Sequence, residues 1–540
     1  MAEETCDVVI IGSGAAGLFC AVAAQALGLR CTVLEKAAQF GGGTAGSAGL
    51  LWVGANHLIA ADGGSDSAQD VIDYLHYVGS GGLDEAKMHR FVREAPGALQ
   101  FFAQQGLPFR LTKFVDHYYG VAPGGKLEGR IVELPPISGR LLGSLGDAVA
   151  LPAGPLYRLA GSESFALGGA NNPRTWDAAA RRERDDPDLR GAGAGLVTWL
   201  LKLAADGGTV LRTGTAVDRL SSTGGRVTGV VTTDGTRIAA RHGVVIACGG
   251  YESNPALVDR YEALPGWQSM FPETLTGDGL IMAGEHGAAI DTIANNLSIF
   301  LGFRNPDERP GAVAVCRLSG IQELIAPHTM VVNRSGRRFA DETFFQAMAP
   351  SLRIYDTMAR TQPNLPCFLI FDHAYVAAHS FGGRPPGAPI PPWVARATTL
   401  AALAAQLGLP AEDLTATARR FSDDVRSGSD TEFHRGETSW GQLRFNAQQT
   451  LGTIEQSPFY GIELHPTALA SAGLRTDTDG RVIDVRGRRM DGLYAIGNAA
   501  ARKETGSGYQ TGFSLGSAMA FGMIAARSLA DKKQGLANKK

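Results

Sequence analysis

The sequence predicts an α/β fold with a buried parallel sheet, and three observations support this. Residues 6–11 (CDVVII) are a short β-branched run without a polar face, typical of a parallel strand covered on both sides. They lead into a glycine-rich turn, an Ala-rich stretch of helical length and a second apolar strand that ends on Glu35. A later apolar run, within residues 237–250, ends in two glycines. This order of elements predicts a Rossmann-like dinucleotide-binding domain.

The composition is that of a folded globular protein. Among 540 residues, 44% are hydrophobic and 19% are charged, which excludes bulk disorder. Lys plus Arg total 50 and Asp plus Glu total 53, so the formal charge is −3, without the basic excess of a nucleic-acid-binding protein. The acidic start MAEETCD runs directly into a strand pattern, and no uncharged apolar run reaches 18 residues. We therefore expect no signal peptide, no integral membrane segment and a cytoplasmic location.

The cysteines point to a reducing compartment rather than to disulfides or a metal. Six cysteines are dispersed along the chain, and none forms a C-x-x-C pair. No Cys/His cluster has the spacing of a zinc site. We expect reduced thiols and no bound metal.

The glycine-rich turn has the spacing of a pyrophosphate-binding loop. Gly12, Gly14 and Gly17 form a G-x-G-x-x-G pattern between strand and helix. The first glycine suits the tight turn, the second lets a pyrophosphate approach the backbone, and the third lets helix and strand lie close together. The helix N-terminus offers N–H donors and a positive dipole end to the phosphates. Glu35 lies 18 positions after Gly17, near the spacing of a ribose-hydroxyl ligand.

A second glycine-rich loop follows almost at once and distinguishes the possible dinucleotides. Residues 40–56 (FGGGTAGSAGLLWVGAN) contain six glycines together with Thr44 and Ser47. An NAD domain needs no such loop here, whereas a flavin passes its pyrophosphate, ribityl chain and ring along an extended track. The whole block resembles flavoproteins of the fumarate reductase and 3-ketosteroid dehydrogenase superfamily, in which a GGT/S-rich loop follows the acidic residue. The resemblance implies FAD as a non-covalent cofactor.

The resemblance also implies that the FAD-binding domain is discontinuous. Residues 237–250 return to this domain, and the strand within 213–220 resembles the one beside the adenine. Residues 491–498 (DGLYAIGN) resemble the strand that brings the ribityl chain back to the sheet. The loop at 506–519 would place the N-terminus of the last helix near the flavin C2 carbonyl, where its dipole stabilises the reduced anion.

These assignments define the expected domains and the expected cofactor contacts. The FAD-binding domain covers 1–275 and 450–540, and an α+β substrate (capping) domain is inserted at 276–449. Within the insertion, residues 326–342 (APHTMVVNRSGRRFADE) resemble a signature of the superfamily. The residues implied to contact FAD lie in the glycine loops and at strand ends. They are Gly12, Gly14, Ala15, Ala16, Gly17, Glu35, Lys36, Gly42, Gly43, Thr44, Ser47, Ala48, Gly49, Val217, Ala247, Gly249, Gly497, Asn498, Ser514 and Leu515.

The first candidate for chemistry is a loop with two adjacent tyrosines. Residues 116–130 contain DHYYGVAPGG and a following Gly-Arg, and they resemble the YYP.APGG…GR stretch of 3-ketosteroid Δ1-dehydrogenases. The sequence departs from that pattern at Gly120, where the family has proline. The resemblance implies that Tyr119 is an active-site phenol, and a hydrogen-bonded core tyrosine is the alternative.

The second candidate loop precedes the last helix. Residues 508–516 (GYQTGFSLG) are similar to the Y.SG.SLG loop of Δ4-(5α)-3-ketosteroid dehydrogenases. By this similarity Tyr509 takes the abstracted proton, Thr511 relays it and the Gly512 N–H polarises the ketone. A phenol with its ordinary pKa of about 10 is a poor base at neutral pH, so this role needs assistance. The alternative is a tyrosine that only caps a turn.

The third candidate is His465, within residues 460–467 (YGIELHPT). Fumarate reductases have a substrate-binding histidine close to this place, so His465 either donates to a substrate carbonyl or holds a loop. Two expected residues are missing. The loop at 508–516 lacks the arginine that dicarboxylates need. Gln346 stands four residues after Glu342, where Δ1-dehydrogenases have a catalytic tyrosine, so the position of the new double bond is left open.

Together these features predict an FAD-dependent dehydrogenase that introduces a C=C bond α,β to the carbonyl of a cyclic ketone. The ketone is a 3-ketosteroid or a smaller cyclohexanone. Gly512, with Tyr119 or His465, polarises the carbonyl, while Tyr509 and Thr511 remove the α proton and flavin N5 takes the hydride. The expected partners are a small hydrophobic ketone and an electron acceptor (a quinone, a dye or oxygen). The alternatives are an ene reductase acting on an enone, and a flavoprotein scaffold or electron carrier without a substrate.

Overall fold

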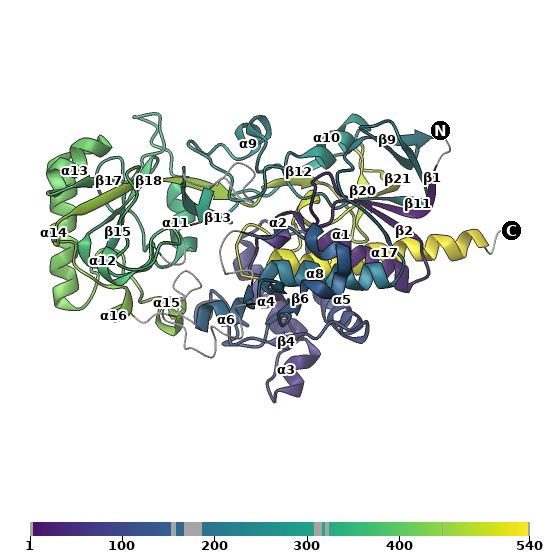
Figure 1. Ribbon diagram of the computed structural model, residues 1–540, viewed down its shortest axis with the longest axis horizontal. Coiled ribbons are helices and arrows are strands. Elements are labelled where there is room, and N and C mark those ends of the chain that lie inside the picture. The colour runs from purple at the N-terminus through teal and green to yellow at the C-terminus, as the bar shows by residue number, and fades with distance from the viewer. Residues whose placement is uncertain are drawn as a thin grey trace.

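Two lobes joined by long strands make up the molecule (Figure 1). The computed structural model describes residues 4–152, 158–166, 186–306, 316–318, 323–444 and 447–537. The N-terminal and C-terminal segments lie together in the first lobe, at the right of Figure 1. Strands β13 (Ile299–Arg304) and β18 (Phe459–Ala468) lead into the second lobe.

The first lobe is built on an eight-stranded sheet whose central strands are parallel. The order is β20-β21-β11-β1-β2-β8, and the antiparallel pair β10 and β9 branches from β11. The strands are Glu4–Ile11 (β1), Cys31–Leu34 (β2), Val210–Arg212 (β8), Val217–Thr223 (β9), Arg226–Thr232 (β10), Arg237–Ile246 (β11), Arg481–Ile483 (β20) and Arg489–Ala495 (β21). β1 lies parallel to both β2 and β11, and β11 lies parallel to β21. The predicted parallel strands and their discontinuous origin are therefore confirmed.

A layer of apolar helices packs together over this sheet. Helix α1 (Ala15–Ala26) contacts both α8 (Ala192–Asp206) and α17 (Phe513–Ala537), and nearly all its residues are buried. Its many alanines keep the helix thin, so neighbouring helices can approach closely. By length and composition α17 could cross a membrane, but most of that stretch is buried within the fold. The apolar surface of α17 is therefore buried in the protein core.

Shorter elements complete the first lobe. The helices are Gly42–Ala45 (α2), His57–Ala61 (α3), Ala68–Gly79 (α4), Glu85–Gln104 (α5), Gly161–Ala166 (α6), Pro255–Tyr261 (α9), Asp278–Glu285 (α10) and the 3₁₀ turns Gly139–Ala148 and Gly497–Ala499. The remaining strands form small sheets: Leu51–Trp52 (β3), Arg110–Leu111 (β4) and Ile131–Glu133 (β5); Ile137–Ser138 (β6) and Leu189–Arg190 (β7); Ile290–Thr292 (β12) and Ala472–Leu474 (β19).

The second lobe has its own antiparallel sheet and its own core. The strand order is β14-β13-β18-β16-β15, with β17 paired to β18. The other strands are Cys316–Leu318 (β14), Thr329–Asn333 (β15), Cys367–Phe371 (β16) and Ala395–Ala397 (β17). The helices are Phe345–Leu352 (α11), His373–Ala378 (α12), Leu400–Leu407 (α13), Ala411–Ser427 (α14), Ser439–Arg444 (α15) and Ala447–Thr450 (α16). The α/β fold with an inserted α+β domain is thus present as predicted.

The strands of the second sheet start and end later in the chain than the expected inserted range of 276–449. Helix α10 packs in the core of the first lobe, together with residues of β1 and β11. Strand β18 pairs with β13, β16 and β17 in the sheet of the second lobe. By sheet membership, the second lobe therefore runs from β13 to β18.

A buried ion-pair network holds the segment before α11 in place. The Arg338 guanidinium donates to the carboxylates of Glu342 and Asp430, and all three side chains are buried. Arg435, also buried, donates to Glu342 and to the backbone carbonyls of Leu324 and Ala326. Because each charge has an opposite partner, the network fixes this segment of the second lobe.

Candidate active site

The carboxyl ends of three parallel strands meet at the first glycine loop. The Ala247 N–H donates to the Ile11 carbonyl, and the Ile496 N–H donates to the Ile246 carbonyl. Gly497 follows directly, and a Cβ atom there would lie 2.7 Å from the Ala16 Cβ. This crevice at the ends of parallel strands is where open α/β sheets bind nucleotides.

The glycines of this loop are required for two different reasons: close backbone contact in two cases and open space for a ligand in the third. A Cβ on Gly12, whose φ is +103°, would lie 2.6 Å from the Ala247 carbonyl oxygen, and a Cβ on Gly17 would lie 2.1 Å from the Gly12 oxygen. The space that a side chain would need at Gly12 and Gly17 is therefore filled by the protein backbone. Around Gly14 the nearest heavy atom to a Cβ is Thr44 Oγ1, at 3.4 Å, so the protein leaves the space there open.

The N-terminus of α1 offers donors toward that open space. Its N-cap residue is Gly14, and no side chain caps the helix at that residue. The Ala15 N–H donates to Thr44 Oγ1 at 2.9 Å, which ties the second glycine loop to the first. A helix start whose N-cap residue has no side chain, beside a bare backbone, fits a pyrophosphate group.

Glu35 and Lys36 lie next to this loop and are already hydrogen-bonded to the protein. Glu35 Oε2 accepts from the Ser13 hydroxyl at 2.7 Å, and Oε1 accepts from the Ala37 N–H at 2.9 Å. Lys36 Nζ donates to Thr276 Oγ1 and forms an ion pair with Asp278 at 2.7 Å. Glu35 stays a predicted ribose ligand, whereas the contacts of Lys36 support a structural role.

The predicted contacts of the second loop separate into two groups. A Cβ added at Gly43 would lie 3.6 Å from Leu275 and one added at Gly249 would lie 2.8 Å from it, so both glycines face the segment at 271–275. Ser47 donates to the Thr44 carbonyl, and Gly49 packs against Ala192 at the start of α8. Ala48 shares this second surface, because its carbonyl oxygen lies beside Gly161.

The strand predicted to lie beside the adenine runs next to Glu35. The Thr215 N–H donates to the Glu35 carbonyl, and the Glu35 N–H donates to the Arg212 carbonyl. Val217 begins β9 directly after this pairing. The strand expected beside the adenine therefore lies beside the predicted ribose ligand.

At the other end of the track, α17 begins against β3. The Trp52 N–H donates to the Gly512 carbonyl at 3.0 Å, and a Cβ on Gly512, whose φ is +91°, would lie 2.5 Å from the Trp52 nitrogen. Gly516 makes a similar close approach to the Trp52 carbonyl. Ser514 and Leu515 are half-buried in the first turn of α17. The start of α17 is thus held in a close backbone contact with β3. Its first N–H groups lie at the positive end of the helix dipole.

Tyr509 and Thr511 lie beside this helix start with His117. The Thr511 hydroxyl lies 2.8 Å from His117 Nε2, and the Tyr509 ring centroid lies 5.6 Å from the His117 ring. Desolvation raises the pKa of Tyr509 to about 12, while a hydrogen bond with Thr511 and the charge of Arg502 lower it. Tyr509 on its own is therefore protonated at neutral pH.

The second lobe contributes the other wall. Phe300 of β13 meets Tyr509 edge to face, with ring centroids 5.0 Å apart. Gln346 of α11 hydrogen-bonds His117 Nδ1, and the Trp440 ring lies 4.2 Å from the His117 ring. The site is therefore formed where the two lobes meet, with His117 at the centre of the contacts.

Several buried side chains fix the loop that carries His117. The Asp116 carboxylate accepts from Trp52 Nε1 at 2.8 Å and from the Arg130 guanidinium at 3.0 Å. Gln510 Oε1 accepts from the His117 N–H at 2.8 Å and from the Tyr74 hydroxyl at 2.5 Å. The histidine is therefore held through both its backbone and its ring.

The two tyrosines of the first candidate loop have different surroundings. Tyr118 packs edge to face on Tyr77 and Phe344, and burial raises the pKa of its phenol well above the ordinary range. Tyr119 is half-buried, and its side chain has no hydrogen-bond partner among the described residues. Among the described residues Tyr119 therefore lacks the setting of a hydrogen-bonded core tyrosine, and its role as an active-site phenol stays a prediction.

His465 lies on β18 opposite Gly302. Its Nδ1 lies 3.0 Å from the Gly266 carbonyl, and Glu463 is 3.9 Å away. Among the described residues, the His465 ring is therefore hydrogen-bonded to the backbone of this chain and shows no contact with Tyr509. The geometry favours the loop-holding alternative over a substrate donor.

Sequence reasoning missed His117, Trp440 and Arg502. Arg502 is buried, and its positive charge is close enough to Tyr509 to lower the pKa of that phenol. One signal for His117 was present, because Gln346 replaces an expected tyrosine and leaves a polar amide that needs a partner. No sequence pattern indicates that α15 would bring Trp440 to the same place.

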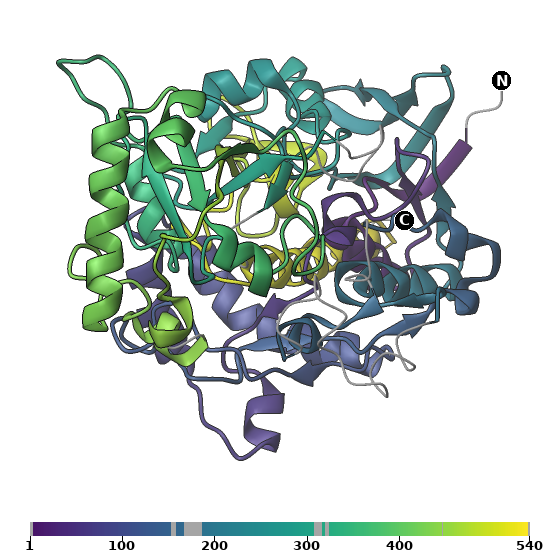
Figure 2. The same ribbon diagram turned by 60° about the vertical axis from the view of Figure 1, so that its left-hand side comes forward.

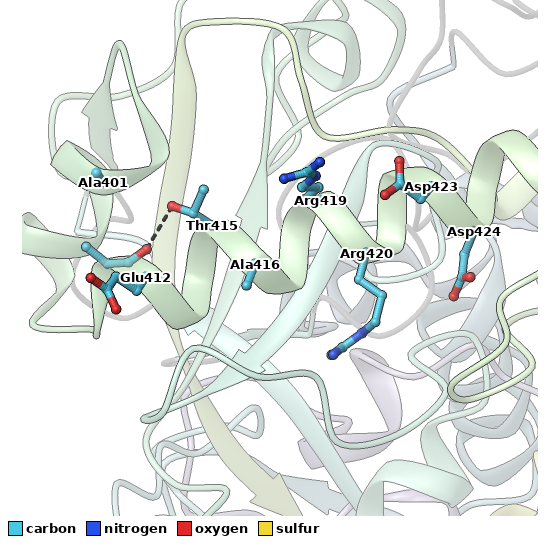
Figure 3. Close-up of a pocket in the computed structure, with 9 residues that line it drawn as sticks. Ala401, Glu412, Thr415, Ala416, Arg419, Arg420, Asp423 and Asp424 are labelled. Atoms are coloured by element: carbon cyan, nitrogen blue, oxygen red, sulfur yellow. Dashed lines mark hydrogen bonds between the residues drawn. The ribbon is translucent and has the colours of Figure 1, made fainter.

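A hollow of about 580 Å³ lies elsewhere, on the surface of α14 (Figure 3). It is lined by charged side chains such as Arg419 and Asp423, and α14 lies at the edge of the molecule far from α1 (Figures 1 and 2). It has neither the glycine loops nor the tyrosines that a flavin site needs.

Comparison with known proteins agrees with this geometry. Residues 7–519 match the family described as FAD binding domain. The chain is 33% identical to the 4-oxocyclohexanecarboxylate 2-dehydrogenase of Sinomonas cyclohexanicum, over 99% of this chain and 94% of that protein. It is 31% identical to the 3-oxosteroid 1-dehydrogenase of Mycobacterium tuberculosis H37Rv, over 98% and 99%.

Solved structures show the same fold over nearly the whole chain. A 3-ketosteroid Δ1-dehydrogenase from Sterolibacterium denitrificans superposes with a TM-score of 0.87 at 27% identity, covering 98% of this chain and 100% of that one. The Δ4-(5α)-dehydrogenase from Rhodococcus jostii RHA1 gives 0.63 at 21% identity, covering 98% of both chains, which shows the fold alone. The Δ4-like character of the loop at 508–516 is therefore a local similarity.

The fold and the site define an FAD-binding flavoprotein. The chain belongs to the FAD binding domain family, in the branch that contains the 3-oxosteroid 1-dehydrogenases. FAD is its cofactor, and the open space beside Gly14 and the start of α1 fit the pyrophosphate of FAD.

Proposed function

We propose that this protein is an FAD-dependent dehydrogenase that introduces a C=C bond α,β to the carbonyl of a cyclic ketone. The observation that carries the proposal is the group formed by Tyr509, Thr511 and Gly512 at the start of α17, faced by Phe300 from the second lobe. The named relatives act on ring ketones, which supports the same substrate class. A 3-ketosteroid and a smaller cyclohexanone are both members of that class.

The residues of the site fit the two halves of a desaturation. The Gly512 N–H and the positive end of α17 stabilise negative charge on the carbonyl oxygen as the α proton leaves. The Tyr509 phenol oxygen receives that proton, and Thr511 is hydrogen-bonded to pass a proton onward. When bound, FAD supplies the acceptor for the β hydrogen as hydride.

The site also favours desaturation over electron carriage without a substrate. A protein that only carries electrons has no use for a tyrosine and a hydroxyl residue beside the flavin end of α17. The ene reductase alternative uses the same residues in the reverse direction, so it is separated by experiment. The electron acceptor (a quinone, a dye or oxygen) and a cytoplasmic location belong to the same proposal.

The test is anaerobic bleaching of the flavin in the purified holoenzyme. The panel contains a 5α-3-ketosteroid, a 3-keto-4-ene steroid, cyclohexanone, 4-oxocyclohexanecarboxylate and succinate. We expect one of the ring ketones to bleach the flavin, which would also define the substrate class. Bleaching by succinate alone would contradict the proposal, and reoxidation of the dithionite-reduced enzyme by an enone without any bleaching would support the reductase.

A matched pair of variants tests the role of Tyr509. Tyr509→Phe should lower the rate of flavin reduction by about 10²-fold or more while the bound flavin keeps its absorbance. Tyr77→Phe, at a half-exposed tyrosine on α4, is the control and should keep the wild-type rate. Equal rates for the Tyr509 variant and wild type would remove Tyr509 from the mechanism.

A further inference from the structure

We propose that His117 is the final proton acceptor of a relay that begins when Tyr509 takes the substrate's α proton and continues through Thr511. This inference rests on the proposed function, because it concerns the same proton. His117 does not touch the ketone in this arrangement, since it acts through Thr511. It is a positioning residue and proton acceptor behind the two residues that face the reacting carbon.

The contacts form a continuous chain of hydrogen bonds. A hydrogen bond joins the Tyr509 and Thr511 side chains, and the Thr511 hydroxyl lies 2.8 Å from His117 Nε2. A proton can therefore move from Tyr509 to His117 along these hydrogen bonds. His117 is only 2% exposed, which leaves the imidazole in fixed orientation.

The need for such an acceptor follows from the properties of Tyr509. Its pKa of about 12 makes the neutral phenol the resting form, and a neutral phenol accepts a proton only while it gives one up. Thr511 can pass a proton but cannot keep one at neutral pH. His117 contacts both residues and has a ring nitrogen of the type that can hold a proton.

Gln346 fixes which nitrogen of His117 is available. The Gln346 amide nitrogen lies beside Nδ1, and in this orientation the neutral imidazole would carry its proton on Nε2. Turning the amide over by 180° exchanges its oxygen and nitrogen, and the relay requires the turned-over amide. With the amide oxygen toward Nδ1, the proton of the neutral imidazole sits on Nδ1 and the Nε2 lone pair faces Thr511. Gln346 thus replaces the tyrosine of the Δ1 pattern with a group that sets the histidine tautomer.

Uncharged side chains contact the His117 imidazole from several sides. The Trp440 ring lies 4.2 Å from the imidazole, and Tyr509, Thr511 and Gln346 also contact it. The neighbouring Asp116 carboxylate is paired with Arg130.

The proton transfer balances as a concerted shift. The α C–H bond breaks, its electron pair stays on the substrate as the enolate, and its proton bonds to the Tyr509 oxygen. The Tyr509 hydroxyl proton moves to the Thr511 oxygen, and the Thr511 proton moves to His117 Nε2. The product is an imidazolium with a proton on each nitrogen. When bound, FAD would supply the acceptor for the β hydrogen and so take up the two electrons that the ketone loses.

The experiment compares flavin reduction in the holoenzyme by the ketone found for the wild type. His117→Ala and His117→Gln should each lower the rate constant by about 10²-fold or more, with the ketone Kd changed by less than about threefold. The Gln variant keeps hydrogen bonding but cannot accept a proton, so it separates relay from packing. Added imidazole should restore part of the rate in His117→Ala.

Matched variants make each outcome decisive. Thr511→Ser keeps the hydroxyl and should keep most of the rate, whereas Thr511→Val should lose it and gain nothing from imidazole. His76→Ala, at an exposed histidine of α4, controls for other effects of imidazole. If His117→Gln reduces its flavin at the wild-type rate, or if imidazole fails to help a folded, FAD-loaded His117→Ala, the relay is overturned. If the wild type is bleached by no ketone, the proposed function fails instead.

Discussion

Glu252 is a buried acid whose charge state depends on folding. Burial raises the pKa of its carboxyl to about 7. One oxygen accepts the Ala470 N–H, and the other has no hydrogen-bond partner among the described residues. The folded protein therefore binds a proton that the unfolded chain releases at lower pH, so stability decreases as the pH rises from the ordinary carboxyl range through about 7.

Replacing this acid removes that dependence. Glu252→Gln should raise the Tm relative to wild type at pH 8, where the wild type bears the buried charge, and have much less effect at pH 5. The difference between the two pH values corresponds to up to about 3 kcal/mol. Thermal unfolding of the holoenzyme at both pH values measures it. Glu273→Gln, at an exposed position, is the control, and an equal Tm difference at pH 5 and pH 8 would contradict the assigned cause.

At the residue scale, the sequence predicted the loop that holds the chemistry but not every member of the site. Tyr509 and Thr511 lie close together in sequence, so a local motif can predict them. His117 is 394 positions from Thr511, and only the packing of the first lobe places their side chains in contact. Trp440 and Gln346 arrive from the second lobe, where no local pattern encodes their distance to His117.

At the element scale, the start of α1 makes a distinct prediction about FAD binding. A Cβ at Gly14 meets no protein atom closer than 3.4 Å, so the apoprotein can accommodate alanine there. The same methyl group would occupy the space expected for the pyrophosphate. Gly14→Ala should therefore weaken FAD binding by about tenfold or more while the Tm of the apoprotein changes little. Flavin titration of the apoprotein and its thermal unfolding measure the two quantities.

Gly97→Ala is the matched control for that substitution. It lies within α5, and its Cβ would meet no atom within 4 Å, so it should stabilise the helix by about 0.5–1 kcal/mol without changing FAD affinity. An unchanged FAD affinity in Gly14→Ala would show that the pyrophosphate lies elsewhere. A large loss of apoprotein stability would show that the space is not open.

The elements most accurately predicted are those with a strong local pattern. The apolar β-branched run of β1 and the Ala-rich run of α1 have one compatible secondary structure each, so their sequences suffice. The limits of the inserted part were harder to place. Strand β18 begins at Phe459, past the expected boundary, because membership of a sheet depends on pairing with β13 and β16.

At the scale of the whole molecule, the two lobes have separate hydrophobic cores. Residues of β1, α1 and α17 form the core of the first lobe, while residues of β13, β15 and β16 form that of the second. The second core is also tied by the buried network of Arg338 with Glu342 and Asp430. The predicted FAD contacts lie almost wholly in the first lobe, so cofactor binding is expected to stabilise the lobes unequally.

Removing FAD should therefore expose one lobe far more than the other. In hydrogen exchange of the apoprotein against the holoenzyme, peptides from β1, the start of α1 and β21 should lose protection, because their loops lose the ligand they enclose. Peptides from β15 and β16 should keep theirs, since their core and ion pairs need no cofactor. Peptides around Gln346 and Trp440 should show an intermediate loss, as they touch His117 across the lobe interface. Equal loss of protection in both sheets would mean that the lobes unfold as one unit and that the cofactor stabilises the second lobe through this interface.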